Sequence, residues 1–366
     1  MAYHIAAYLT LAFTLFTLIP RTRFTHWLIR VLDFPRLQIS VGLTLCLAIM
    51  LAGLLSGSAL SWWEWPGIIF IPGCLALMLQ ARWILPYTPF YPVKVPRAQT
   101  SERSKQLTIL SANVLMTNDR YQALIDRVQQ YQPDILVTLE SDDRWEEALA
   151  VLHDNYPYRV ACPLKNLYGM HVYSRLPLHE SEIKFLVEDD KPSIHAALQI
   201  ADDWVNLHFM HPAPPSPTEN PSSGERDAEL LVLARKLETN GAIPAIVTGD
   251  LNDVAWSKST QTFLQISRLK DPRIGRGTFN TFHTHYWFAR WPLDHLFHSE
   301  AFKLVKMKRL KSIGSDHFPL LATLAYEPDN RLPKEPPPSK DDRDYAQERI
   351  DEQSVSAADV PNPARQ

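Results

Sequence analysis

The sequence predicts a layered α/β fold between residues 106 and 326, preceded by three transmembrane helices. Two observations predict this class. In the first part of the central region, apolar runs of strand length alternate with segments of helical periodicity, and in the later part the strand-like runs dominate. Upstream lie three apolar runs of about 18 residues or more, which is long enough to cross a bilayer. A chain of 366 residues has room for more than one structural unit.

Residues 1–86 are assigned to a membrane anchor. The first apolar run covers residues 2–19; a signal peptide is the alternative, but no Lys or Arg precedes the run and a basic stretch follows it. Residues 37–60 and 66–85 form the second and third runs. The arginine-rich stretch 21–36 between the first two either lies in the membrane interface or is a short basic loop. A lipid bilayer is therefore an expected partner.

Charge is distributed unevenly along the chain. Residues 1–105 carry nine Lys/Arg and three Asp/Glu, concentrated in the first loop and after the third run. The positive-inside rule places both segments, and the domain that follows, in the cytoplasm of a multi-pass plasma or inner membrane protein. Residues 106–326 have a net charge of -5, which counts against a nuclease because a domain that holds a long polyanion usually presents a basic face.

Two segments flank the central domain. Residues 87–105 contain several prolines and are predicted to be a stiff linker. Residues 327–366 are rich in Pro, Asp, Glu, Arg and Ser and poor in apolar residues, so a disordered tail is predicted. The three cysteines show neither a disulfide framework nor a metal-binding spacing.

The central domain is organised around residues 245–252, where an apolar strand runs into Gly-Asp-Leu-Asn. Other apolar strands are predicted at residues 107–112, 134–139, 205–210 and 320–324, and helices at 121–132 and 227–239. Polar groups at the ends of rigid strands commonly build a site. The polar residues at or beside these strand ends are Asn113, Glu140, His211, Asp250, Asn252, Asp294, Asp316 and His317.

In this order, the motifs resemble the endonuclease/exonuclease/phosphatase superfamily, which includes deoxyribonuclease I, abasic-site endonucleases, neutral sphingomyelinases and inositol polyphosphate 5-phosphatases. The resemblance covers about residues 107–326 and is most specific at Gly-Asp-Leu-Asn (249–252) and Ser-Asp-His (315–317). It implies a four-layer sandwich of two mixed β-sheets flanked by helices, with the strand ends opening at one edge. A three-span anchor before such a domain resembles bacterial membrane proteins whose domain faces outward, so the side of the membrane stays open.

The resemblance also implies hydrolysis of a phosphate ester with a divalent cation, Mg²⁺ or alternatively Mn²⁺. Such cations take oxygen ligands from carboxylates and amides. Glu140, Asn113 and Asp316 are the expected metal-site residues. The alternative for Glu140 is a solvated helix start, since three polar residues follow it.

The catalytic roles follow the same resemblance. His317 is expected to be the general acid/base or a stabiliser of the phosphoryl oxygens, oriented by Asp294. Asp250 is expected to position or deprotonate the attacking water, and Asn252 to hydrogen-bond a phosphoryl oxygen. His211 resembles the strand-end histidine that lies by the scissile phosphate in deoxyribonuclease I.

Weaker signals concern substrate binding. Tyr168 and Arg226 are candidates to contact the substrate, although a tyrosine is more often a packing residue. Leu115 stands where abasic-site endonucleases carry an acidic residue, which argues against repair of abasic DNA.

Together these observations predict a membrane-anchored, metal-dependent hydrolase of phosphodiesters or phosphomonoesters, acting on a lipid or another membrane-proximal substrate. Two alternatives stay open: an endonuclease or exonuclease on nucleic acid, and a catalytically silent binding module tethered to the membrane. The sequence predicts no protein partner.

Overall fold

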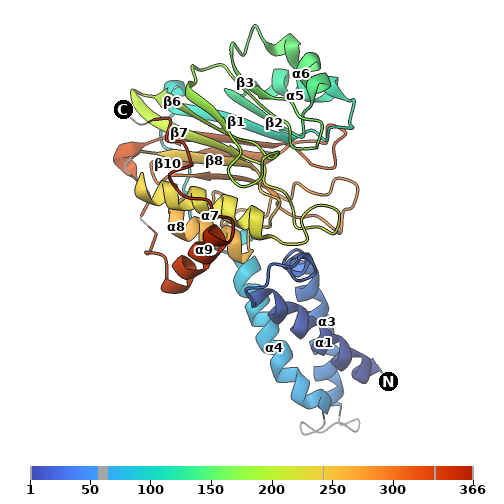
Figure 1. Ribbon diagram of the computed structural model, residues 1–366. Coiled ribbons are helices and arrows are strands. Elements are labelled where there is room, and N and C mark those ends of the chain that lie inside the picture. Colours follow the sequence, from blue (N-terminus) through green and yellow to red (C-terminus); the bar gives the residue numbers. More distant parts are fainter. Residues whose placement is uncertain (1, 57–64, 242, 334, 365–366) are drawn as a thin grey trace. The chain divides into compact units, whose positions relative to one another are not determined.

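The structure is a computed structural model that describes residues 2–56, 65–241, 243–333 and 335–364. The chain forms two compact units (Figure 1). The smaller unit comprises Met1–Pro92, Pro215–Ser223 and Gly275–Gly277, and the larger unit comprises Val93–Pro214, Gly224–Ile274 and Thr278–Gln366.

The smaller unit contains three long helices, α1 (Ala2–Leu18), α3 (Arg36–Leu55) and α4 (Trp65–Ile84). Each is long and apolar enough to cross a membrane, as the sequence predicts. The last four residues of the predicted second run, 57–60, lie outside the described residues. The short helical turns of this unit are η1 (Ile19–Arg21), α2 (Trp27–Arg30), η2 (Val31–Asp33) and η3 (Leu85–Tyr87).

Small and polar residues line the contacts between the three long helices. A Cβ atom added to Gly73 would lie 2.4 Å from the Thr10 side chain, so the two helix backbones approach closely there. Gln80 donates a hydrogen bond of 2.9 Å to the Thr17 hydroxyl, which joins α4 to α1. Large apolar side chains such as Ile71 and Met78 are about 60% exposed on the outer surfaces of these helices. This arrangement, with polar contacts inside and apolar groups outside, suits a lipid environment.

The larger unit contains two mixed sheets. The first has the strand order β10-β11-β1-β2-β4-β3 and the second β5-β6-β7-β8-β9. Only β1 with β2 and β7 with β8 pair in parallel among the described strands. The strands are β1 (Gln106–Asn113), β2 (Ile135–Leu139), β3 (Tyr158–Cys162), β4 (Met170–Ser174), β5 (His179–Lys184), β6 (Ser193–Ile200), β7 (Asp203–Met210), β8 (Ala245–Asp250), β9 (Asp294–His298), β10 (Phe302–Arg309) and β11 (Leu320–Tyr326).

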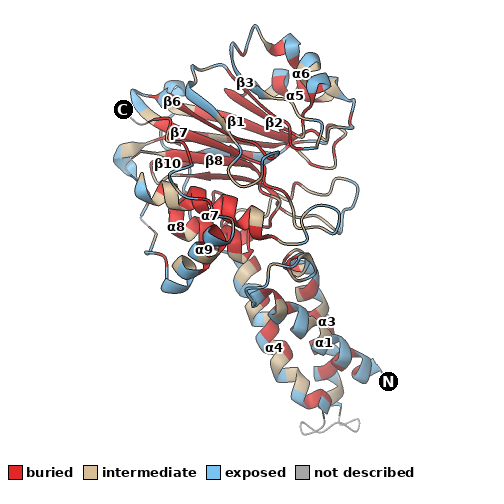
Figure 2. Ribbon diagram, viewed as in Figure 1, coloured by how far each residue is buried: buried red, intermediate tan, exposed pale blue. Residues whose placement is uncertain are grey.

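The two sheets pack face to face, and helices cover both outer faces, which confirms the predicted four-layer sandwich (Figures 1 and 2). Alternation along a strand decides which side chains face which layer. In β1, Ile109 belongs to the core between the sheets, whereas Leu110 packs under the outer helices. Helices α5 (Tyr121–Tyr131) and α6 (Asp143–Ala148) cover the first sheet, and α7 (Gly224–Thr239) and α8 (Lys258–Ser267) cover the second. The remaining turns are η4 (Arg103–Lys105), η5 (Leu149–Leu152) and η6 (Pro328–Asn330).

The larger unit begins at Val93, inside the segment 87–105 that was predicted to be a linker. Val95 is fully buried in the core between the sheets, and the Ala98 amide donates to the Leu304 carbonyl of β10. The second half of residues 87–105 is thus part of the larger unit, because an apolar residue among the prolines has a place in the core.

The prediction of a disordered tail at residues 327–366 is wrong for the described part of that segment. Helix α9 (Lys340–Glu352) starts with a capping box in which Ser339 and Asp342 satisfy one another's backbone amides. Tyr345 and Ile350 of this helix are buried with α7 and α8 in the outer core of the second sheet. The composition is polar overall, but its few apolar residues lie on one face of a helix, which an average over the segment cannot show.

Candidate active site

The two sheets bring polar strand ends together at one edge. Asn113 ends β1 and Asp250 ends β8, so they belong to different sheets. The Asn113 amide nitrogen donates to the Glu140 carboxylate at 2.7 Å and to the Asp250 carboxylate at 3.1 Å. One side chain therefore joins the candidate metal-binding glutamate of the first sheet to the candidate catalytic aspartate of the second.

The backbone turns sharply at these positions. Gly249 has a φ of 145°, and a Cβ atom there would lie 2.0 Å from the Met210 carbonyl oxygen on the neighbouring strand, so only glycine fits. Glu140 and Asn252 have φ values of 57° and 51°, in the left-handed region that non-glycine residues seldom occupy. Such conformations concentrate at functional sites because the surrounding structure must maintain them.

His317 lies between two buried carboxylates. Its Nδ1 atom is 2.8 Å from the Asp294 carboxylate, and its Nε2 atom is 3.4 Å from that of Asp250. Burial disfavours the imidazolium, but the charges of Asp250 and Asp294 outweigh this effect and raise the pKa of His317 to about 10. The imidazole is therefore protonated at neutral pH and stands ready to donate a proton. The predicted pairing of His317 with Asp294 has the geometry that this chemistry requires.

The surroundings of Glu140 disfavour ionisation of its carboxyl group. Burial raises the pKa of its carboxyl to about 7, and the charges of Asp316 and Asp250 add to the rise, while the Asn113 hydrogen bond and the His317 charge oppose it. Burial likewise raises the pKa of Asp250, against the opposing charge of His317. The solvated helix start considered for Glu140 does not describe this half-buried side chain, which accepts a hydrogen bond from Asn113.

His211 and Asn252 border the same cluster. Burial lowers the pKa of His211 to about 4, so its ring is neutral at neutral pH. The Nδ1 atom of His211 is buried and has no hydrogen-bond partner among the described residues. The Asn252 amide donates to the Pro212 carbonyl at 3.0 Å, directly after His211, and retains a second hydrogen. The ring of Tyr168 lies 5.1 Å from that of His211, so the predicted substrate contact stands beside the cluster.

Arg226 lies behind the cluster instead of facing it. Its side chain is 1% exposed and forms an ion pair of 2.8 Å with Asp227 and another of 3.4 Å with Asp253. Its Nη1 atom donates to the Asn252 carbonyl at 2.8 Å. The predicted contact of Arg226 with substrate is therefore replaced by a supporting role, because the guanidinium is enclosed and holds the 250–253 turn in place.

Asp316 and the loop of residues 281–291 complete the edge. The Thr284 amide donates to the Asp316 carbonyl at 2.8 Å, and the ring of Phe282 lies 4.9 Å from that of His317. The Asp316 carboxylate is partly exposed and accepts from the Ser315 hydroxyl. Phe282 and Thr284 were not predicted as site residues, because this loop has neither strand nor helix periodicity.

The donor atoms suit a hard divalent cation. Oxygen atoms of Glu140, Asp250 and Asp316 are close enough that their negative charges raise the pKa of Glu140, and a cation would relieve that repulsion. A second grouping, Asp250, Asp294 and His317, also has ligand atoms within 4.8 Å of one another. In this grouping the histidine already bridges both carboxylates, so we favour the predicted Glu140 side for a metal.

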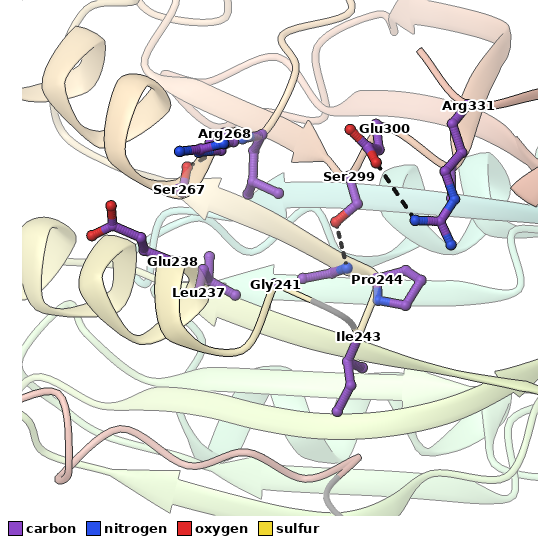
Figure 3. Close-up of a pocket in the computed structure, with 13 residues that line it drawn as sticks. Leu237, Glu238, Gly241, Ile243, Pro244, Ser267, Arg268, Ser299, Glu300 and Arg331 are labelled. Atoms are coloured by element: carbon purple, nitrogen blue, oxygen red, sulfur yellow. Dashed lines mark hydrogen bonds and ion pairs between the residues drawn. The ribbon is translucent and has the colours of Figure 1, made fainter. Parts of the chain in front are cut away.

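A pocket of about 400 Å³ lies at the opposite end of β8 from these residues (Figure 3). Pro244 and Ala245 line it where β8 begins, together with Ser299, Glu300 and Arg331. None of the predicted site residues lines this pocket, so it is separate from the edge where the catalytic candidates converge.

Comparison with known proteins identifies a family for this chain and several solved structures with a similar fold. The model of the endonuclease/exonuclease/phosphatase family matches residues 110–317, more than half of the chain. No curated protein sequence matches the chain. Among solved structures, a humanized D. rerio TDP2 carrying 14 mutations has 18% identity and a TM-score of 0.49, with 60% of this chain and 99% of that chain covered. The human Nocturnin catalytic domain has 17% identity and a TM-score of 0.49, with 62% and 96% covered.

A third similar structure is an endonuclease/exonuclease/phosphatase from Beutenbergia cavernae, with 16% identity, a TM-score of 0.49, and 61% of this chain and 72% of that chain covered. The family assignment rests on the family model, whose match includes the Gly-Asp-Leu-Asn turn and ends at His317. The chain therefore belongs to the endonuclease/exonuclease/phosphatase family, whose members hydrolyse phosphodiester or phosphomonoester bonds.

Proposed function

We propose that the chain is a membrane-anchored phosphoesterase that uses Mg²⁺, or alternatively Mn²⁺, to hydrolyse a phosphate ester of a lipid or another membrane-proximal substrate. The observation that carries the proposal is the hydrogen-bonded set in which Asn113 links Glu140 to Asp250, while His317 links Asp250 to Asp294. The three apolar helices support the membrane part of the proposal. Members of the family generally depend on a divalent metal.

Glu140 and Asp316, with Asn113 beside them, would hold the cation. When bound, it would neutralise charge on the phosphoryl oxygens and lower the pKa of an attacking water. Asn113 would fix the position of the Glu140 carboxylate, because its amide nitrogen already donates to that carboxylate. The Asn113 oxygen accepts from the Leu115 amide, so the direction of the side-chain amide is set by the backbone.

His317 would donate its proton to a phosphoryl or leaving-group oxygen. Asp294 orients the ring and stabilises the imidazolium, since its carboxylate accepts from Nδ1 and leaves Nε2 directed toward Asp250. Asp250, whose pKa burial raises, would accept the proton of the attacking water. Asn252 and the neutral His211 would contact the phosphoryl oxygens through the amide hydrogen and ring nitrogen described above.

A lipid substrate fits the charge of the domain better than a long nucleic acid does. Residues 106–326 carry a net charge of -5, and a long polyanion would be repelled by most of that surface. A single phosphate headgroup would require only the positive charges of protonated His317 and of the bound cation.

The test uses the full chain in a neutral detergent, because α9 packs on the catalytic domain and a truncation at residue 327 would remove it. Phospholipids, lipid pyrophosphates, phosphosugars, DNA and RNA are compared with and without Mg²⁺, with His317→Ala as the inactive control. Metal-dependent turnover of a lipid phosphate is expected. A higher kcat/KM on DNA or RNA would establish the nuclease alternative, and a folded protein without turnover on any phosphate ester would favour the silent module.

A further inference from the structure

Two arginines lie against the ring of Phe318, the residue that directly follows His317. The guanidinium carbon of Arg309 is 4.4 Å from the ring centroid, and that of Arg290 is 5.1 Å from it. The two come from different elements, since Arg309 ends β10 and Arg290 belongs to the 281–291 loop. This loop is joined to the candidate site by the hydrogen bond from the Thr284 amide to the Asp316 carbonyl.

Backbone carbonyls hold both guanidinium groups in place. Arg309 donates to the Asn280 carbonyl at 2.8 Å, and Arg290 donates to the carbonyls of His283 and Thr284 at 3.3 and 3.1 Å. An arginine has five N–H donors, so each side chain retains donors for another acceptor. Arg290 is half-buried and Arg309 is exposed, so a ligand from solvent has access to them.

Neither guanidinium forms an ion pair with a carboxylate among the described residues. The fully buried Arg226 and Arg273 of the same unit, in contrast, each pair with an aspartate at 2.8 Å. Burial and the charge of Arg290 lower the pKa of the Arg309 guanidinium. Two cations beside one ring, neither paired with a carboxylate among the described residues, repel one another in the free protein, and a bound anion would relieve that repulsion.

Two ordinary explanations account for part of this arrangement. Cations often pack on aromatic rings, and basic residues on an edge strand prevent association with another sheet. β10 is an edge strand, and its exposed Lys306 and Lys308 satisfy the second explanation. Neither explanation requires a second arginine from a separate loop to reach the same ring next to His317.

We infer that Arg290 and Arg309 form an anion subsite beside the candidate active site, which binds a second phosphate or similarly charged group in addition to the phosphate that is hydrolysed. The inference rests on the proposed function for its catalytic context. Guanidinium groups bind phosphate oxygens through paired hydrogen bonds, so two of them select a group with several anionic oxygens. The second anion comes either from the substrate itself or from a neighbouring anionic lipid.

The first experiment measures binding without catalysis. The full chain in neutral detergent, with a chelator to remove metal, is titrated with sulfate and followed by calorimetry. We expect Arg309→Gln and Arg290→Gln each to weaken sulfate binding about tenfold, since a charge-assisted hydrogen bond contributes roughly that factor. Arg309→Lys should fall between wild type and Arg309→Gln, because it keeps the charge and loses the planar fork.

Two controls locate the sulfate. Lys308→Gln removes an exposed cation from the same strand, next to Arg309, and should leave binding unchanged. His317→Ala should also retain the binding, whereas its loss would show that sulfate occupies the catalytic centre and would overturn the subsite. Equal sulfate binding in wild type and both glutamine variants would overturn it as well. None of these outcomes depends on whether the protein is a phosphoesterase.

The second experiment identifies the source of the anion. Hydrolysis of a prenyl phosphate and the matching prenyl diphosphate is compared in neutral micelles, and the monophosphate is also measured in micelles that contain phosphatidylglycerol. A KM about tenfold lower for the diphosphate assigns the second anion to the substrate, and a lower KM only with phosphatidylglycerol assigns it to a neighbouring lipid. Either preference should disappear in Arg309→Gln while kcat on the monophosphate in neutral micelles is retained. A preference that persists in that variant would exclude the two arginines as its cause.

Discussion

The charge on Glu140 should govern how tightly the protein binds a divalent cation. Burial, with Asp316 and Asp250 nearby, raises the pKa of Glu140 from 4.5 to about 7, which corresponds to about 3 kcal/mol of resistance to ionisation. A cation must displace that proton, because a metal ligand binds in its ionised form. The apparent affinity should therefore be constant above pH 8 and fall about tenfold per pH unit below pH 7, close to a hundredfold between pH 8 and pH 5.

Glu140→Gln keeps the size of the side chain and removes both the charge and the titration. Its Mg²⁺ affinity should be weaker than that of wild type at pH 8 and nearly independent of pH. Glu229→Gln is the matched control, because burial raises the pKa of Glu229 as well, to about 8, and Glu229 is not one of the predicted site residues. Calorimetric titration with Mg²⁺, supported by Mn²⁺ electron paramagnetic resonance, gives the affinities between pH 5 and pH 8. A pH slope that survives in Glu140→Gln, or is absent from wild type, would refute the assignment of Glu140 as a ligand.

Three further predictions use other residues. His317→Ala should lower kcat by roughly two to four powers of ten, the usual effect of a lost acid/base group, and leave Mg²⁺ affinity nearly unchanged, as kinetics and calorimetry on one preparation can show. Burial raises the pKa of Glu229 from 4.5 in the unfolded chain to about 8 in the folded protein. The neutral carboxyl therefore contributes fully to stability below pH 4.5, and the free energy of unfolding falls by at most about 5 kcal/mol as the pH rises through 8. Thermal unfolding of Glu229→Gln should lack this pH-dependent loss. Ile350→Ala should lower the free energy of unfolding by about 2–4 kcal/mol, because it leaves a cavity at a buried position on α9. The control Asp344→Ala, at an exposed position on the same helix, should change it by less than about 0.5 kcal/mol. Equal denaturation midpoints for the two variants would support the original prediction of a disordered tail.

The parts of the fold that could be predicted are those in which a continuous run of mainly apolar residues determines the secondary structure. The strands at residues 107–112, 134–139 and 245–248 are buried throughout and mostly apolar, because both faces of each are covered in the four-layer arrangement. Strand β5 was not predicted, since four of its six residues are exposed and polar or charged side chains dominate it. Helix α9 was missed for the related reason that one buried face is hidden within a highly charged composition.

The candidate site was predictable at residue level where a short motif carries it. Asp250 and His317 stand in the two most specific motifs, and the structure places them 3.4 Å apart although 66 positions separate them in the sequence. Arg226 shows the limit of such reasoning, because its charge suggested a substrate contact while its actual partners, Asp227 and Asp253, enclose it. The 281–291 loop shows the opposite case, in which side chains without any motif reach the site only through the fold.

The position of the C-terminal segment has a consequence for how the protein is made. α9 completes the helical layer over the second sheet, and further along the Asn362 side chain and the Ala364 amide bond to Asn206 on β7. Translation proceeds from the N-terminus, so both sheets are synthesised before the residues that complete the helical layer over the second sheet. A chain truncated before α9 would therefore expose the apolar surface that Tyr345 and Ile350 cover, and quality-control proteases recognise such surfaces.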